Sequence, residues 1–144
     1  MDEIPTGALV SFDANALIYY LEPHDHFFPV VQPFFRQIVS GHLQAATSYL
    51  TLLEVLVGPL RQNERTLADR YRSFLTARDG VRLLPIDRLI SERAAEIRAQ
   101  HGLRTPDSIV AATALEANCT HLVTNDTAFR RVENLNVLVV SDYA

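Results

Sequence analysis

The stretch Ala8-Leu9-Val10-Ser11-Phe12-Asp13 predicts a short apolar strand that ends at an acidic residue, and a helical pattern follows it through Tyr20. A second apolar segment, residues 121–124, is followed at once by Asn125 and Asp126. Short strands separated by helical segments indicate a parallel sheet. Three more such strands are predicted at residues 44–46, 81–85 and 137–140.

Helical segments with recognisable ends lie between these strands. Thr47 or Ser48 is expected to cap a helix that Gly58 and Pro59 interrupt. Thr105-Pro106-Asp107 predicts a helix start, with a hydroxyl cap, a proline in the first turn and an acid beside the positive end of the helix dipole. The other predicted helices cover residues 27–39, 64–77 and 88–101, the last capped by Asp87 and closed by Gly102.

The size and composition fit one compact domain. The chain has 144 residues, of which 48% are hydrophobic, and a formal charge of -4. We therefore expect a single α/β domain over residues 1–144, with a central, mainly parallel sheet of about four or five strands flanked by helices. The longest apolar segment, residues 50–60, is broken by Glu54 and Pro59, so no membrane span is predicted. The acidic start of the chain is unlike a secretory signal, so we expect a cytoplasmic protein.

All 13 basic side chains are arginine, because the sequence contains no lysine. This excludes P-loop nucleotide binding and Schiff-base catalysis, which need a lysine ammonium. A G+C-rich genome is the simplest cause of the bias. Residues 61–104 hold ten arginines against six acids, whereas both ends of the chain are acidic. This basic segment fits either a nucleic-acid surface or ordinary solvated helices.

Four acids are predicted to meet at one edge of the sheet. Asp13 and Asp126 follow strands whose carboxyl ends share that edge, which is where open parallel sheets bind ligands. Glu54 lies in the helix after the second strand, and Asp107 lies in the first turn of another helix. Simpler roles also exist: Asp13 and Asp126 fit helix caps, and an acid at the position of Asp107 favours the helix dipole.

Glu54 has the weakest simple explanation, because it stands among leucines and valines, and a carboxylate on an apolar face needs a partner or a cation. Clustered carboxylates repel one another unless a divalent ion neutralises them. Ligation by oxygen alone favours Mg²⁺, with Mn²⁺ as a substitute. Such an ion activates water for attack on a phosphodiester. The acids therefore predict metal-dependent phosphodiester hydrolysis.

The same residues resemble a known family. Phe12-Asp13-Ala14-Asn15 near the start, Glu54 in a leucine-rich helix, Thr105-Pro106-Asp107-Ser108 and Thr124-Asn125-Asp126 are similar to the four acidic motifs of PIN-domain nucleases. The resemblance covers nearly the whole chain, and its length is that of the VapC toxins of VapBC toxin–antitoxin modules.

This resemblance implies a magnesium-dependent endoribonuclease with Asp13, Glu54, Asp107 and Asp126 as catalytic, metal-binding acids, supported by Asn15 and Thr124. It also implies a homodimer and a VapB-like antitoxin whose C-terminal segment lies across the active-site groove. Asn125 departs from the family, in which arginine is frequent there, and this concerns substrate contacts. Two alternatives remain: a housekeeping PIN nuclease without an antitoxin, and a catalytically silent RNA-binding domain.

Half of the aromatic residues lie between residues 19 and 35. Most are expected in the core. Any that stay exposed between the first two helices would form an apolar groove for an amphipathic partner segment. The predicted antitoxin contacts are Tyr19, Tyr20, Phe27 and Phe28.

Overall fold

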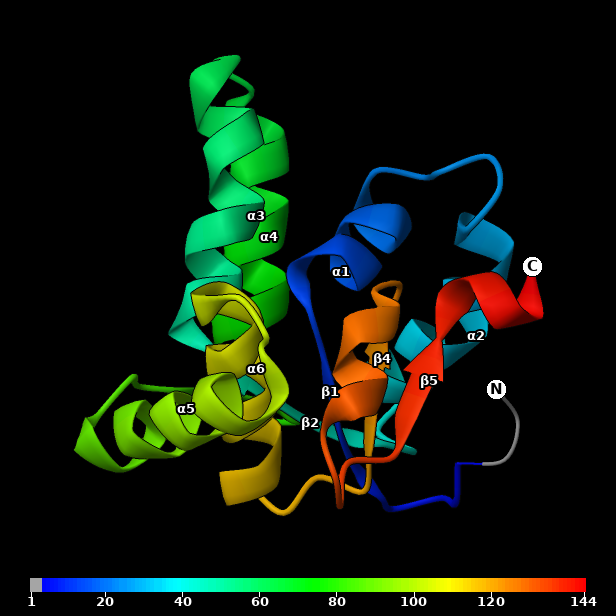
Figure 1. Cartoon of the computed structure of the whole chain (residues 1–144). Coiled ribbons are helices and arrows are strands. Elements are labelled where there is room, and N and C mark those ends of the chain that lie inside the picture. Colours follow the sequence, from blue (N-terminus) through cyan, green and yellow to red (C-terminus); the bar gives the residue numbers. More distant parts are fainter. Residues whose placement is uncertain (1–3) are drawn as a thin grey trace.

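The computed structural model describes residues 4–144, so the first three residues of the acidic start lie outside the described part. Five strands form one sheet, and every pairing in it is parallel, in the order β3-β2-β1-β4-β5 (Figure 1). The predicted α/β class with a parallel sheet is confirmed. The strands are β1 (Leu9–Phe12), β2 (Gln44–Ser48), β3 (Val81–Leu84), β4 (His121–Thr124) and β5 (Val137–Val139).

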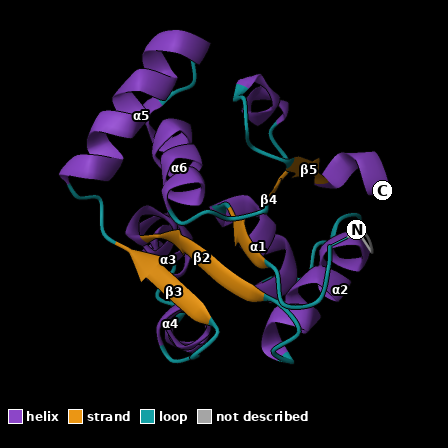
Figure 2. Cartoon of the chain, turned by 90° about the horizontal axis from the view of Figure 1, so that it is seen from below, coloured by secondary structure: helices purple, strands orange, loops and turns teal. Residues whose placement is uncertain are grey.

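Helices cover both faces of the sheet. On one face, α1 (Ala14–Leu21), α2 (Phe28–Val39), α3 (Tyr49–Arg61) and α4 (Arg65–Thr76) share the larger apolar core. On the other face, α5 (Arg88–His101), α6 (Thr105–Glu116) and the 3-10 turn η1 (Thr127–Arg131) form a second core. A short η2 (Val140–Tyr143) ends the chain. Figure 2 shows α4 on one side of β3 and α5 and α6 on the other.

This arrangement divides the basic segment that the sequence singled out. The helices α4 and α5, which carry many of these arginines, lie on opposite faces of the sheet (Figure 2). The excess positive charge of residues 61–104 therefore does not form one continuous surface. Ordinary solvated helices account for most of it.

Local signals explain where most helices begin and end. The Ser48 hydroxyl accepts a hydrogen bond from the Leu50 N–H, so Ser48 caps α3, and the Asp87 carboxylate caps α5 through the Ile90 N–H. Gly102 has the left-handed conformation expected of a residue that closes a helix, with φ of 69°. The predicted cap of α6 was wrong: Thr105 is already helical, and Arg104 holds the cap position without a side-chain hydrogen bond to the helix backbone.

The prediction that Gly58 and Pro59 interrupt a helix was also wrong, because α3 continues through both to Arg61. Pro59 lacks one N–H donor, but its ring is buried. Burial against the core offsets the missing hydrogen bond. The Gln62 N–H donates to the Gly58 carbonyl, so the helical pattern resumes within one turn.

α6 packs closely because its residues are small. Ala111, Ala112 and Ala114 are fully buried between the helix and its neighbours. This close packing fixes the first turn of α6, and with it Asp107, relative to the sheet. Within residues 4–144 none of the helices is both long and apolar enough to cross a lipid bilayer.

Candidate active site

Asp13 stands at the carboxyl end of β1 and at the start of α1. Its Oδ1 accepts a hydrogen bond from the Ala16 N–H at 3.1 Å, so the residue caps α1. Its Oδ2 accepts a hydrogen bond from the Thr124 hydroxyl at 2.5 Å. The register makes this second contact possible, because Phe12 pairs with Val123 on the neighbouring strand β4. The side chain is therefore fixed by one local contact and one contact across the sheet.

Thr124 joins the ends of two acidic motifs. It is fully buried, and its Oγ1 accepts a hydrogen bond from the Asp126 N–H at 3.1 Å while donating to Asp13. Asp126 in turn caps η1, with Oδ1 accepting from the Ala128 N–H at 2.9 Å. One hydroxyl thus sets the positions of both strand-end acids, and the predicted supporting place of Thr124 has this geometric basis.

Asp107 lies in the first turn of α6, where only 16% of its side chain is exposed. Its Oδ2 is 3.3 Å from the Nε of Arg104, which precedes it by three residues. The Arg104 side chain is 77% exposed, so this ion pair is open to solvent on one side. The sequence analysis missed Arg104, because a single arginine outside the acidic motifs gives no pattern of its own.

Glu54 is exposed on α3, which overturns the reasoning that an apolar face makes its charge costly. α3 has apolar residues around most of its circumference, and it buries the side that carries Thr51, Val55 and Pro59. Leu53 and Val57 on the opposite side are 59% and 42% exposed. Glu54 is therefore open to solvent, and it also feels the charge of Asp107.

The pKa values show that the acids act on one another. Burial raises the pKa of Asp13 to about 6; hydrogen bonds from Thr124 and Ala16 oppose this rise, and the charges of Asp107 and Glu54 add to it. Partial desolvation and then the charge of Asp107 raise the pKa of Glu54, while Arg104 lowers it. These mutual effects require short separations, because water screens distant charges.

Asp107 and Asp126 complete the set. Desolvation raises the pKa of Asp107, the positive charge of Arg104 lowers it, and the negative charge of Asp126 raises it. Each of the four predicted acids is therefore coupled to at least one other, with Asp107 linked to the remaining three.

Within residues 4–144 no group of three or more histidine, cysteine or acidic side chains is already arranged as a metal site. Asp13 is turned toward Thr124, and Asp107 toward Arg104. The chemistry of the donors nevertheless fits a hard divalent cation, because carboxylates that raise one another's pKa are relieved by such an ion.

The two asparagines of the motifs differ in their surroundings. Asn15 is exposed on the first turn of α1. Asn125 is tied down: its Nδ2 donates to the Tyr19 hydroxyl at 3.2 Å, and its Oδ1 accepts from the Ser141 N–H at 2.9 Å. At position 125, where the resemblance implies a frequent arginine, this chain has a neutral side chain that connects α1 to η2.

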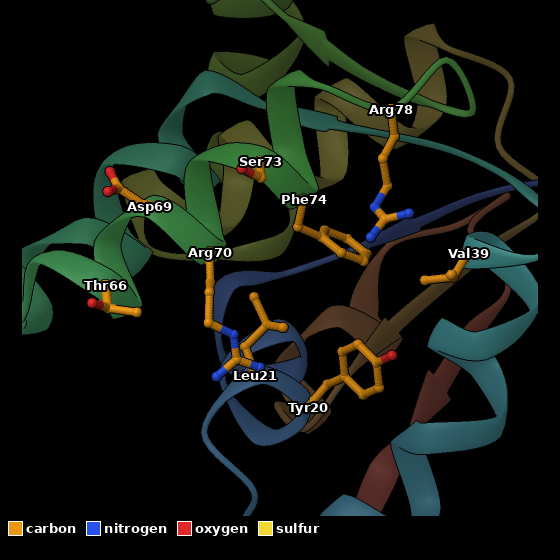
Figure 3. A pocket seen from close by; sticks show the side chains of 9 residues that line it. All are labelled: Tyr20, Leu21, Val39, Thr66, Asp69, Arg70, Ser73, Phe74 and Arg78. Atoms are coloured by element: carbon orange, nitrogen blue, oxygen red, sulfur yellow. The ribbon is translucent and has the colours of Figure 1, made fainter.

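A separate cleft lies away from the acids, between α1, the end of α2 and α4 (Figure 3). Its volume is about 470 Å³. Arg70 and Arg78 point into it, and the Arg78 guanidinium lies 5.2 Å from the centre of the Phe74 ring. The remaining lining residues are Tyr20, Leu21, Val39, Thr66, Asp69 and Ser73.

Of the four aromatics predicted to contact a partner, Tyr20 lines this cleft. The others contact neighbouring rings: Tyr19 lies 4.9 Å from Phe27, and Phe28 stacks at 6.1 Å on Tyr20. All four are partly buried. The open groove expected between α1 and α2 is therefore filled by aromatic side chains, and the cleft lies next to it, against α4.

Comparisons with known proteins identify the domain and the fold. The sequence model of the PIN domain matches residues 10–135. A toxin–antitoxin complex from Klebsiella pneumoniae is 25% identical, with a TM-score of 0.68 over 93% of this chain and 98% of that one. Comparison with curated protein sequences gives no match.

Two further structures share the fold. FitAcB from Neisseria gonorrhoeae is 20% identical, with a TM-score of 0.70 over 92% of this chain and 98% of that chain. VapC20 of Mycobacterium tuberculosis, described as a toxin that cleaves the sarcin–ricin loop, is 16% identical, with a TM-score of 0.68 over 84% of this chain and 92% of that chain.

Proposed function

Because this chain belongs to the PIN domain family, we propose that it is a metal-dependent endoribonuclease and the toxin of a type II toxin–antitoxin module. The observation that carries the proposal is the electrostatic coupling of Asp13, Glu54, Asp107 and Asp126 at one edge of the sheet. The similarity to a toxin–antitoxin complex supports the toxin assignment, and the RNA-cleaving neighbour supports the substrate. The place of action is the cytoplasm, where its RNA is found.

Each of the predicted site residues has a separate role in the proposed reaction. Asp13, Glu54, Asp107 and Asp126 hold Mg²⁺ or Mn²⁺, which when bound lowers the pKa of water and offsets the negative charge that builds up on the phosphate. Thr124 keeps Asp13 and Asp126 in register through its two hydrogen bonds. Asn15 is exposed in the first turn of α1, and its proposed role is to support the metal-binding acids on the side that the substrate approaches.

We assign the antitoxin to the cleft between α1, α2 and α4. Tyr20, Leu21 and Phe74 give the cleft an apolar wall, and Arg70 and Arg78 give it positive charge (Figure 3). An amphipathic VapB-like segment with acidic residues matches this lining. Phe28 stacks on Tyr20, and Tyr19 contacts Phe27 beside them.

A homodimer is the proposed resting assembly. Tyr49, Leu53, Val57 and Leu60 are between 42% and 59% exposed, and they follow one another along α3 at helical spacing. Gly58 beside them has open space where a Cβ would stand. An apolar stripe next to a position without a side chain allows a second helix to approach closely.

The direct test is incubation of the protein with total RNA, with and without Mg²⁺, and with Asp13→Asn as the control variant. We expect cleavage only by the wild-type protein with metal, leaving 5′-phosphate and 3′-hydroxyl ends, because attack by water needs no 2′-hydroxyl. Products with a 2′,3′-cyclic phosphate would contradict the mechanism. Cleavage by Asp13→Asn at the wild-type rate would show that Asp13 is not a catalytic residue.

The toxin role has its own test. A neighbouring reading frame that encodes a small DNA-binding protein, and co-purification of that protein with this chain, would support a toxin. A housekeeping PIN nuclease would cut RNA but have no such partner. A silent RNA-binding domain would bind RNA and leave it intact.

A further inference from the structure

Arg104 is a cation in contact with the candidate active site. Its charge lowers the pKa of both Asp107 and Glu54, and its Nε lies 3.3 Å from the Asp107 carboxylate. Among the causes that act on Asp13, Glu54 and Asp107, no other positive charge occurs within the described residues. The position is fixed by the backbone, because the Arg104 carbonyl accepts hydrogen bonds from Ser108 N and Oγ.

The ion pair with Asp107 does not use the whole guanidinium. Only Nε takes part, at a long distance of 3.3 Å, and within residues 4–144 the two terminal nitrogens donate to no partner. The side chain is 77% exposed. An exposed pair of this kind contributes at most about 1 kcal/mol to stability. The small gain in stability therefore does not explain why an arginine stands at this edge of the sheet with, within residues 4–144, no partner for its two terminal nitrogens.

An RNA strand needs a positively charged group at this edge of the sheet in order to approach the four acids. Four carboxylates repel the phosphates of an approaching RNA strand, and the neutral Asn125 gives no compensation. The planar fork of arginine matches the geometry of a phosphate better than any other side chain. We infer that Arg104 binds a backbone phosphate of the RNA substrate beside the four acids. This inference rests on the proposed ribonuclease function.

The competing explanation is that Arg104 acts only as an internal counter-ion for Asp107. In that case Arg104→Gln would weaken RNA binding only indirectly, by leaving the Asp107 charge exposed. The two explanations differ when Asp107 is also replaced by asparagine. A counter-ion loses its purpose in that background, whereas a phosphate-binding arginine becomes fully free to contact RNA.

The experiment measures binding of a labelled single-stranded RNA by fluorescence anisotropy in EDTA, so that cleavage does not interfere, over a range of salt concentrations. We expect Arg104→Gln to weaken binding about tenfold and to reduce the slope of log K against log salt by about 0.7, the value for one phosphate contact on a single strand. Asp107→Asn should bind RNA more tightly than the wild-type protein. Arg104→Gln should weaken binding in that background as well.

Arg93→Gln is the matched control. Arg93, on α5, pairs at 3.2 Å with Glu116, which ends α6 about 14 Å along that helix from Asp107. We expect it to leave both affinity and slope unchanged. If Arg104→Gln loses its effect when Asp107 is asparagine, or has none at all, the inference is overturned. If the wild-type protein neither binds nor cuts RNA, the proposed function itself is overturned.

Discussion

Replacing Asp13 by asparagine tests whether a buried charge destabilises the metal-free fold. The pKa of Asp13 is raised from 3.8 to about 6, mainly by burial, so the unfolded chain releases this proton at a lower pH than the folded protein does. The stability linked to Asp13 is complete below about pH 4, falls as the pH rises toward 6 and is lost above it. At pH 7 the charged carboxylate therefore lowers the free energy of unfolding by about 3 kcal/mol.

Asp13→Asn keeps an oxygen that can accept the hydrogen bond from Ala16 and removes the charge. In EDTA at pH 7 we expect the variant to be more stable than the wild-type protein by up to about 3 kcal/mol, with Tm rising about 3 °C for each kcal/mol. The gain should fade toward pH 4. Urea unfolding over this pH range measures it, and Asp87→Asn reports the effect of exchanging a capping carboxylate for an amide outside the site.

Magnesium should narrow or reverse the difference, because an ion that binds the folded wild-type protein stabilises it while the variant has lost a ligand. A gap between Asp13→Asn and the wild-type protein that does not change with pH would refute the argument. So would a variant that is less stable than the wild-type protein in EDTA at pH 7. Either result would mean that burial and the neighbouring acids do not oppose the charge of Asp13.

Three other changes have defined outcomes. Mg²⁺ at about 100 times its Kd should add about 2.7 kcal/mol to the free energy of unfolding; calorimetry that finds no rise in Tm at saturating metal would exclude the metal site. Thr124→Val should lower stability by about 1–3 kcal/mol and reduce RNA cleavage, because it removes the hydrogen bonds to Asp13 Oδ2 and from the Asp126 N–H, whereas Thr124→Ser should keep both. Urea unfolding and cleavage assays compare the two, and equal behaviour would refute this role. Leu60→Glu should convert the proposed dimer to a monomer in light scattering, and Gln62→Glu should not; an unchanged mass for Leu60→Glu would place the interface elsewhere.

The sheet was predictable from short apolar runs because parallel strands are buried on both faces and have little polar alternation. Their order was not predicted, although the convergence of Asp13 and Asp126 depends on β1 and β4 being neighbours. The two acids meet for a simple reason: every strand in a parallel sheet ends at the same edge.

The errors arose where the sequence has no single preferred face. α3 carries leucine and valine around most of its surface, so its pattern did not show that Val55 faces the core and Leu53 faces solvent. The role of Glu54 was predicted in part from its apolar neighbours in the sequence, but the residue is exposed on α3. Pro59 was taken as a helix end for a related reason, since its burial depends on α3 packing against the rest of the domain.

Capping and metal binding are not competing explanations for these acids. A carboxylate has two oxygens and about four acceptor positions, and Asp126 uses only Oδ1 to cap η1, while within residues 4–144 its Oδ2 accepts no hydrogen bond. Asp13 likewise caps α1 through one oxygen and faces β4 with the other. The caps hold both side chains at the ends of their strands. A local role therefore strengthens the case for a shared cation, because a ligand that the backbone has already ordered loses less conformational freedom when the ion binds.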